Sequence, residues 1–274
     1  MYNFRSKKHL LSIIFFNNRL KDYEEIIRSA VTNGYEVCSV SDFYNRYVVG
    51  KENLPKRVMI LRHDIDYKNP GTRKMFEIES KYGVRSTYYF RDSTVEEELV
   101  NVIHRGGADV GYHYETIAYL VQNGTIRRKN DIDINAAREN FKNEFESFQK
   151  RVGFGVDTCA AHGAPENIKL GVSNNIIFED IDPQLLGVRF EAYDPNLIAK
   201  ISCYTSDSGI MYNYGYAYST QPLEAIQKGE QVICFLSHPN HWYMSFYERL
   251  KKLVRMVIGK GIYSSELSFR RLDK

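Results

Sequence analysis

Apolar and polar positions follow two different periods along this chain, and the two periods alternate. Residues 20–31 carry apolar side chains at helical spacing and stop before Asn33 and Gly34, which predicts a helix ending at a glycine. The run 58–61 is short and continuously apolar, which is typical of a buried strand. Repetition of this order predicts an α/β fold, with a mostly parallel sheet or barrel covered by helices.

The same patterns give the remaining elements. Further helices are predicted over 70–82, 95–104, 134–151 and 246–258, and further strands over 35–40, 86–90, 110–113, 176–178, 201–204 and 231–236. The small residues at 159–165 are interpreted as a loop. No linker, repeat or low-complexity tract interrupts the chain, so residues 1–274 are expected to form a single domain.

Composition changes this picture little. A content of 43% hydrophobic and 26% charged residues is typical of a soluble protein that can bury a core. The formal net charge of +3 is too small to indicate nucleic acid as a partner. The basic clusters at 5–9 and 127–129 and the acidic turn at 179–182 are interpreted as solvated surface.

Cysteine usage and the N-terminal pattern favour a cytoplasmic protein. The cysteines are far apart and form no CxxC pair, so we expect reduced thiols, most of them buried; they are Cys38, Cys159, Cys203 and Cys234. The apolar run 10–16 is short and lacks a small-residue cleavage site, so no signal peptide is expected. No segment is long and apolar enough to predict a membrane span.

The most informative chemistry follows the apolar run 58–61. In an extended chain residues i and i+2 point to the same side, so Asp64 and Asp66 are expected to project together, with Arg62 one step behind. Two carboxylates this close raise each other's pKa, and a divalent cation or a shared proton would relieve the repulsion. His63 falls on the opposite face, where packing is the simpler interpretation.

Three histidines also lie at predicted strand ends or in glycine- and proline-containing loops: His113, His162 and His238. In parallel α/β folds the chemistry gathers at the carboxyl ends of the strands. One histidine among apolar residues is more often a core residue, but three of them beside an Asp-x-Asp pair favour a common site. Aspartate and histidine together are ligands expected for zinc or a similar divalent ion, with one position left for water.

Other candidates keep two interpretations each. Arg62 either pairs with the acids for structural reasons or takes part in catalysis. The segment 205–209 is either a turn or a loop that contacts the substrate. Trp242 either stacks on a sugar face or packs in the core, and the tyrosine-rich segment 211–218 is either a cleft wall or a subunit contact.

An ordered series of motifs resembles the polysaccharide deacetylase superfamily, that is, NodB-homology proteins and relatives in carbohydrate esterase family four. The motifs are Arg62-His63-Asp64-Ile65-Asp66, Gly111-Tyr112-His113-Tyr114-Glu115, His162-Gly163 and Ser237-His238-Pro239. The first motif is most similar to the branch with an RHDVD-type sequence. The resemblance covers about residues 20–242. It implies a distorted (β/α) barrel of about seven parallel strands, and metal-assisted hydrolysis of N- or O-acyl groups on sugars.

The resemblance also implies roles for individual residues. Asp64 would be the catalytic base and His238 the acid that protonates the leaving group, while Asp66 and His113 would bind the metal. The family usually has a second histidine where this chain has Ile117, so the third ligand is His162 or Glu115, and we favour His162. The family's arginine-proline motif is absent, and the segment 160–163 stands in its place. Residues expected to contact the substrate are Arg62, Glu115, Asp207, Ser208 and Trp242.

These observations predict a zinc-dependent hydrolase of an acylated sugar. Its substrate would be a nucleotide- or lipid-linked precursor or a small metabolite, and bacterial surface-polysaccharide (O-antigen or capsule) biosynthesis is the preferred setting. One alternative is an amidohydrolase that acts on another C–N bond, such as a formamide or ureide. The other is a sugar-binding protein that has lost its metal, which the isoleucine at position 117 would permit.

Overall fold

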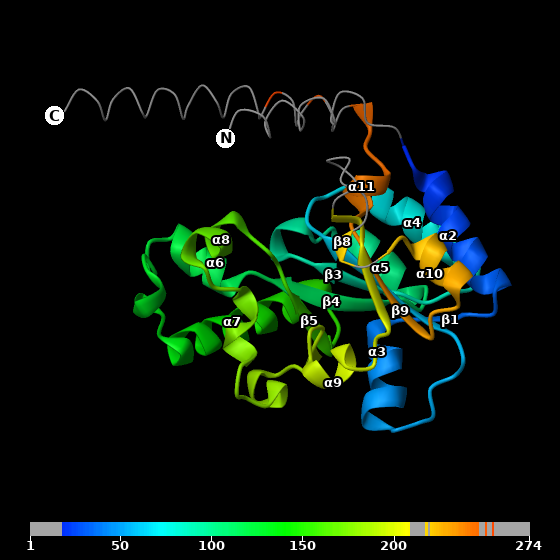
Figure 1. The fold of residues 1–274 in the computed structure, drawn as a ribbon. Coiled ribbons are helices and arrows are strands. Elements are labelled where there is room, and N and C mark those ends of the chain that lie inside the picture. Colours follow the sequence, from blue (N-terminus) through cyan, green and yellow to red (C-terminus); the bar gives the residue numbers. More distant parts are fainter. Residues whose placement is uncertain (1–17, 209–216, 219, 247–249, 251–253, 255–274) are drawn as a thin grey trace, which may run out of the picture.

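The computed structural model describes residues 18–208, 217–218, 220–246, 250 and 254, which form one nine-stranded sheet with helices around it (Figure 1). The strand order is β6-β5-β4-β3-β2-β9-β7-β8, and β1 pairs with β2 outside this path. Seven strands, from β6 to β7, are parallel and curl into a half-barrel, while β8 is antiparallel to β7. The predicted α/β class and distorted barrel are therefore confirmed.

The strands are β1 (Glu36–Cys38), β2 (Val58–Ile65), β3 (Thr87–Phe90), β4 (Asp109–Tyr114), β5 (Thr158–Ala161), β6 (Phe190–Glu191), β7 (Cys203–Ser206), β8 (Ala217–Tyr218) and β9 (Val232–Ser237). Strand β2 is central, and all of its residues are buried. One edge of β2 pairs with β9 from Val58 to His63. The other edge pairs first with β1 and then, from Arg62 to Ile65, with β3. The carboxyl end of β2 is thus held between two parallel neighbours.

The helices are α2 (Leu20–Thr32), α3 (Val40–Phe43), α4 (Gly71–Lys81), α5 (Glu97–Arg105), α6 (Thr116–Gln122), α7 (Ile134–Val152), α8 (Pro165–Leu170), α9 (Pro195–Ile198), α10 (Pro222–Lys228) and α11 (Pro239–Trp242). A π-helical turn, Tyr44–Val49, continues α3. Helices α2, α4 and α10 lie together on one side of the sheet, and α6, α7 and α8 lie toward the β5 side (Figure 1). None of the helices in the described part of the chain is long and apolar enough to cross a membrane.

Three apolar clusters hold these layers together. The largest contains Phe141, Phe145 and Phe148 of α7, whose spacing of four and three residues puts all three on one helical face. A second cluster joins α2 and α10 to β2 and β9. The third fills the inside of the half-barrel, where Phe43 and Tyr47 pack against residues of β2 and β9. Burial of each large side chain stabilises the fold by about 1.5–3 kcal/mol.

Several element predictions need correction. The apolar run 176–178 is not a strand but part of a 3₁₀ helix, Asn174–Phe178, because a run of three apolar residues has no period that separates the two structures. The segment 159–165 is predicted as a loop, but its first three residues, 159–161, belong to the buried strand β5. Strand β2 extends through Asp64 to Ile65, and β7 begins at Cys203 rather than at residue 201. Most of the predicted helix 246–258 and of the segment 211–218 lies outside the described residues.

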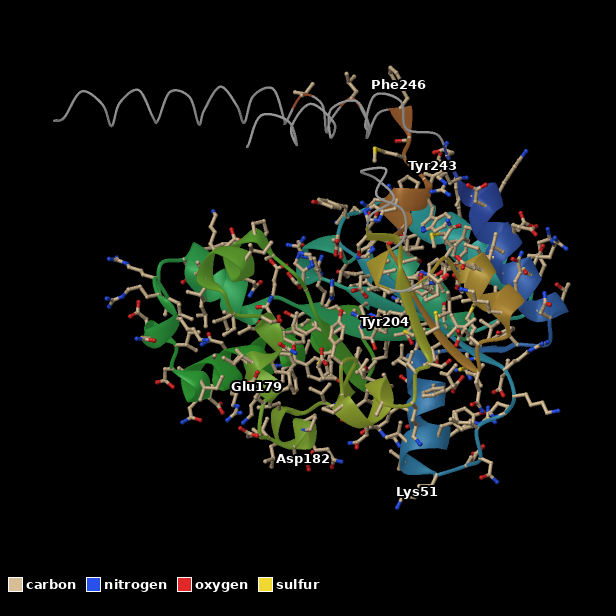
Figure 2. All side chains as sticks on the ribbon, in the orientation of Figure 1. Lys51, Glu179, Asp182, Tyr204, Tyr243 and Phe246 are labelled. Atoms are coloured by element: carbon tan, nitrogen blue, oxygen red, sulfur yellow. The ribbon has the colours of Figure 1, made fainter. Side chains whose placement is uncertain are left out.

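Other surface and thiol predictions agree with the structure. Glu179 and Asp182 are exposed at the edge of the molecule, as expected for a solvated acidic turn (Figure 2). All four cysteines are free and buried. Residues 1–17, which include the apolar run considered as a signal peptide, lie outside the described part of the chain.

Candidate functional site

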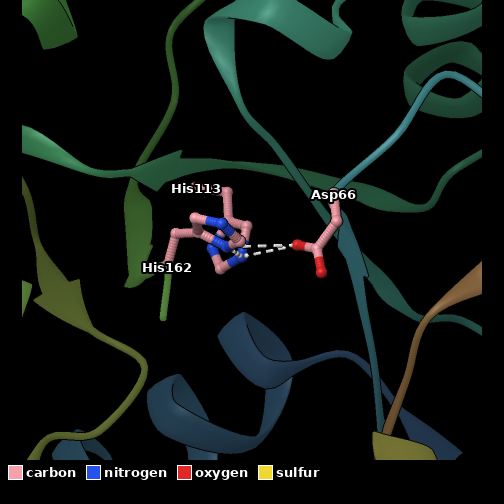
Figure 3. Close-up of side chains that lie close together, drawn as sticks. All are labelled: Asp66, His113 and His162. Carbon is pink, nitrogen blue, oxygen red and sulfur yellow. Dashed lines mark hydrogen bonds and ion pairs between the residues drawn. The ribbon is translucent and has the colours of Figure 1, made fainter. Parts of the chain in front are cut away.

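The carboxyl ends of β2, β4 and β5 bring three predicted ligands together. Asp66 follows β2, His113 lies near the end of β4, and His162 follows β5 (Figure 3). Asp66 Oδ1 lies 3.3 Å from His113 Nε2 and 3.2 Å from His162 Nδ1. The two imidazole nitrogens are themselves 3.2 Å apart. One carboxylate oxygen and two nitrogens therefore form a nearly equilateral triangle.

The size of this triangle fits a tetrahedral metal ion. A tetrahedral zinc with bonds of about 2.0–2.1 Å has ligand atoms about 3.3 Å apart. The three separations here, 3.2, 3.2 and 3.3 Å, match that edge length. Three protein ligands also leave a fourth position for water or substrate, as in catalytic zinc sites.

Hydrogen bonding around the triangle also favours a bound cation. Asp66 Oδ1 is buried yet accepts no hydrogen bond, which a buried carboxylate oxygen rarely tolerates unless a cation is present. His113 Nδ1 lies 2.9 Å from the carbonyl of Ala160, so its proton is donated there and Nε2 keeps a lone pair that points into the triangle. The residues present thus fit a divalent cation.

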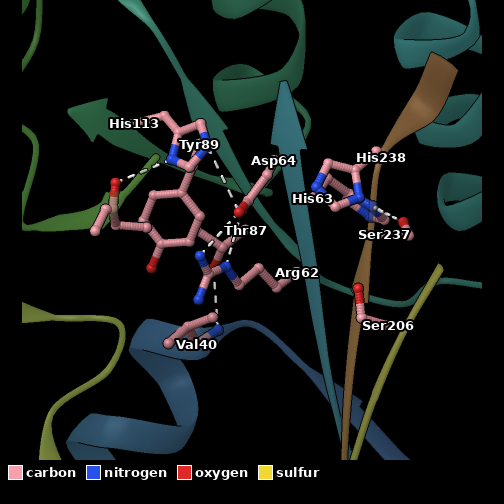
Figure 4. A network of polar contacts seen from close by, with 12 residues as sticks. Val40, Arg62, His63, Asp64, Thr87, Tyr89, His113, Ser206, Ser237 and His238 are labelled. Carbon is pink, nitrogen blue, oxygen red and sulfur yellow. Dashed lines mark hydrogen bonds and ion pairs between the residues drawn. The ribbon is translucent and has the colours of Figure 1, made fainter. Parts of the chain in front are cut away.

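Asp64 lies beside this triangle and is held by Arg62. The guanidinium donates two hydrogen bonds, from Nε to Asp64 Oδ1 at 2.8 Å and from Nη2 to Asp64 Oδ2 at 2.9 Å. Both side chains lie on the same side of β2, as the alternation predicts, and His63 lies on the other (Figure 4). Burial alone would raise the pKa of Asp64, but Arg62 and then His113 lower it below its ordinary value. Asp64 Oδ2 is 3.6 Å from His113 Nε2.

His238 also lies near the triangle. It follows β9, and its Nε2 is 3.9 Å from Asp66 Oδ2. Its Nδ1 is 2.6 Å from Asp207 Oδ1, and its backbone N–H donates to Asp207 Oδ2 at 2.8 Å. Burial would lower the pKa of His238, but the charge and hydrogen bond of Asp207 raise it to about 9. His238 is therefore protonated at neutral pH.

Three residues predicted to contact substrate are instead buried supports. Trp242 is 0% exposed and donates its indole N–H to Asp207 Oδ2 at 2.6 Å, so it cannot stack on a sugar in this structure. Asp207 is also fully buried and binds His238. Arg62 is 1% exposed, and its guanidinium lies between the rings of Tyr89 and Tyr193. Exposure of these side chains depends on the fold and is not encoded by the local sequence.

Two other predicted residues lie at the rim. Glu115 forms an ion pair with Arg91, which follows β3, and Arg91 also donates to the backbone carbonyl of Asp66. Glu115 is not in the ligand triangle. Ser208 is exposed, and its hydroxyl lies 2.7 Å from that of Ser206. Contact of either residue with a substrate stays a prediction.

Ile117 occupies the position where the family resemblance leads one to expect a histidine. It is fully buried in the largest apolar cluster, on α6. The second imidazole of the triangle comes instead from another strand end, that of β5, through His162.

The sequence interpretation missed the residues that hold His162. Asn174 is 0% exposed and donates from its side chain to the carbonyl of His162 at 2.6 Å. Glu191 is 4% exposed and accepts the N–H of Ala161, the residue before His162, at 3.0 Å. The one local signal in the sequence is that Glu191 lies between the apolar residues Phe190 and Ala192. A carboxylate buried among apolar residues requires hydrogen-bond partners.

A second polar network lies behind β2. His63 Nε2 is 2.8 Å from Glu79 Oε1, and His63 Nδ1 is 2.7 Å from the hydroxyl of Ser237. Glu79 also accepts hydrogen bonds from Tyr23, Ser86 and Tyr88. His63 is therefore buried as predicted, but it makes polar contacts with Glu79 and Ser237 rather than packing against apolar side chains alone.

Comparisons with known proteins give fold-level similarity only. No family model matches this chain, and neither does any curated protein. One similar solved structure is a Streptococcus pyogenes deacetylase, PplD, in complex with acetate, at 12% identity and a TM-score of 0.41 over 80% of this chain and 83% of that one. Another is a mutant of a CE4-family pseudoenzyme with restored enzymatic activity, at 13% identity and 0.41 over 74% and 63%. Those descriptions belong to those proteins, and the case for this chain rests on its own residues.

Proposed function

We propose that this chain is a metal-dependent hydrolase that removes an N- or O-acyl group from a sugar. The observation that carries the proposal is the triangle of Asp66, His113 and His162, with Asp64 3.6 Å from one of its side chains and His238 3.9 Å from another. Its support from sequence is the motif series that resembles the polysaccharide deacetylase superfamily. We propose zinc as the ion, because the donors are one carboxylate and two imidazoles at tetrahedral spacing.

A divalent cation at the triangle would polarise an acyl carbonyl and lower the pKa of a water molecule placed beside it. The protein itself supplies a base and an acid. Asp64 is ionised, because Arg62 keeps its pKa low, and it can accept a proton from water. His238 carries a proton that Asp207 holds on the ring, and it can donate that proton to the leaving amine or alcohol.

Opposite environments give the two groups these opposite roles. A bidentate arginine stabilises the charged form of the carboxylate, and a buried carboxylate stabilises the charged form of the imidazole. At neutral pH one group is therefore ready to accept a proton and the other to donate one. Such a pair is what acid–base hydrolysis requires.

For the substrate we propose an acylated sugar linked to a nucleotide or lipid, or a small acylated sugar, in the cytoplasm. Bacterial surface-polysaccharide biosynthesis is the proposed setting. Both proposals come from the sequence resemblance, and the described residues supply the chemistry of acyl hydrolysis rather than the identity of the sugar.

The test combines metal analysis with turnover. Purified protein should contain about one zinc per chain and release acetate from a member of a panel of N- and O-acetylated sugars. The D64N variant should keep its zinc and lose activity by about 10²- to 10⁴-fold. The same panel should include formylated and cyclic-amide substrates. If the protein prefers one of these, that compound class would replace acylated sugars as the proposed substrate. Metal-free protein, or an unchanged rate in D64N, would contradict the proposal.

A further inference from the structure

Glu191 is a buried carboxylate that none of the catalytic steps uses. It ends β6, which lies at one edge of the sheet, and it is 4% exposed. Its Oε1 accepts the backbone N–H of Ala161 at 3.0 Å, and its Oε2 accepts the backbone N–H of Tyr193 at 2.5 Å. One side chain therefore joins two backbone segments that lie far apart in the sequence.

The first contact replaces a missing strand partner. Pairing of β5 with β6 ends at Cys159 and Glu191, and the carbonyl of Cys159 still accepts the N–H of Ala192. The next N–H of β5 on that edge belongs to Ala161, and the Glu191 side chain accepts it.

The peptide that carries His162 is thereby held on both edges of β5. On the β4 edge, the N–H of His162 donates to the carbonyl of Tyr114 at 2.8 Å. On the β6 edge, Glu191 binds the preceding N–H. His162 lies after the end of β5 and has no regular strand pairing of its own. Its position in the ligand triangle depends on these two contacts and on Asn174.

The second contact of Glu191 connects it, through Tyr193 and Arg62, to the proposed base Asp64. Tyr193, whose N–H binds Glu191, accepts a hydrogen bond from Arg62 Nη2 at its hydroxyl, at 3.2 Å. The centre of its ring lies 4.6 Å from the Arg62 guanidinium. Arg62 in turn holds both oxygens of Asp64.

We propose that Glu191 is a positioning residue that places the metal ligand His162 and the Arg62–Asp64 pair relative to each other. This inference rests on the proposed function, because it takes the triangle as the metal site. Glu191 itself touches neither the triangle nor the reacting atoms. It acts through two backbone N–H groups, and its effect should therefore appear in metal affinity as well as in turnover.

The experiment compares the zinc affinity of wild-type protein with that of E191Q, measured by competition with a chromophoric chelator. Glutamine keeps the shape of the side chain but presents an NH₂ group to one of the two backbone donors, so one contact is lost. Loss of a group that orients a metal ligand typically weakens metal binding by about 10- to 100-fold. We expect a weakening in that range for E191Q.

E79Q is the matched control. Glu79 is also a buried glutamate with several donors, but its partners lie behind β2 and none of them belongs to the triangle. E79Q should lower the melting temperature and leave zinc affinity within about threefold of wild type. Wild-type zinc affinity in E191Q, or an equal loss in E79Q, would overturn the inference.

Folding failure also has a defined meaning. If E191Q does not fold, E191D takes its place, because it retains the charge but is too short to reach both N–H groups, and it should bind zinc more weakly than wild type. Failure of both Glu191 variants to fold, while E79Q folds, would make Glu191 a structural residue and reject the inference. If wild-type protein binds no zinc at all, the proposed function fails rather than this inference alone.

Discussion

Two clusters at the same end of the sheet contain one aspartate and two histidines each, yet they differ in what they can bind. In the first cluster, Asp66 lies 3.2 and 3.3 Å from two imidazole nitrogens, and its Oδ1 accepts no hydrogen bond. In the second, Asp207 lies 2.6 Å from His238 Nδ1, and its other oxygen accepts two further N–H groups. The first spacing suits a metal ion between the atoms, and the second suits a shared proton.

The contrast shows that residue composition does not define a metal site. Both clusters satisfy a simple rule of three grouped ligand residues. In the Asp207 cluster the oxygen and nitrogen atoms are at hydrogen-bond distance, which leaves no room for an ion with bonds of about 2.0–2.1 Å to both. These distances favour the Asp66 cluster as the proposed metal site and the Asp207 cluster as the proposed site of a shared proton.

The largest expected effect is the loss of metal from the first cluster. D66A removes the one charged ligand of the triangle, so zinc content should fall from about one per chain to a level that is not measurable after dialysis, and activity should fall with it. D207A, at the second cluster, should retain its zinc. Elemental analysis of both variants decides between the clusters. Zinc retained in D66A and lost in D207A would reverse our assignment.

The next effect concerns the proton on His238. D207N removes the charge that raises the pKa of His238 to about 9, so that pKa should fall toward the ordinary value of about 6.5. Because the acid works only while protonated, the alkaline limb of the kcat/KM profile should move to lower pH. At pH 8 about 90% of His238 is protonated with a pKa of about 9 but only about 3% with a pKa of about 6.5, so the rate should fall about 30-fold. An alkaline limb that does not move would contradict the role of Asp207.

The two clusters were not equally accessible to sequence reasoning. Asp66 and His113 could be predicted, because each lies at or just after the end of a strand with a clear apolar run. The contact of Asp207 with His238 could not be predicted, because it requires β7 and β9 to be neighbours. The segment 205–209, which is compatible with a turn or a substrate loop, carries no information about strand pairing. The Asp207–Trp242 contact likewise joins residues brought together only by the fold.

The parts of the fold that escaped prediction had weak local signals. β5 consists of Thr158, Cys159, Ala160 and Ala161, which are small and show no period, and β6 has only two residues. These two strands carry or support His162 and Glu191. The sequence therefore predicted which candidate ligands lie together better than it predicted the strands that orient them.

A smaller effect distinguishes Glu191 from Asp207 by the pH dependence of stability. Burial raises the pKa of Glu191 to about 7. Burial would also raise the pKa of Asp207, but the neighbouring imidazoles of His241 and His238 outweigh it and lower that pKa. A raised pKa stabilises the folded state at low pH, and this contribution is lost as pH rises from the unfolded value, about 4.3, through about 7.

For Glu191 the loss across that range is about 3 kcal/mol, and E191Q should remove it. For Asp207 the direction is opposite, since stability is present above its unfolded pKa and is lost as pH falls below it. Urea unfolding of metal-free wild type and E191Q between about pH 4 and 8 measures the slope for Glu191, and unfolding of wild type and D207N from about pH 5 down to about pH 2 measures the slope for Asp207. Parallel curves for wild type and E191Q would show that Glu191 does not titrate in this range.

The smallest effect belongs to His241, and it is the sharpest check on the comparison. His241 Nδ1 lies 3.2 Å from Asp207 Oδ1, but it makes no hydrogen bond, while His238 holds the same oxygen at 2.6 Å. If the Asp207 cluster stores a proton, His241 is a secondary partner, and H241N should change kcat by less than about tenfold and zinc content not at all. If the cluster instead binds an ion, His241 is one of its three ligands, and H241N should lower zinc content. Parallel zinc analysis and kcat measurements on H241N and H162N therefore separate the two interpretations, because only H162N removes a ligand of the proposed metal site.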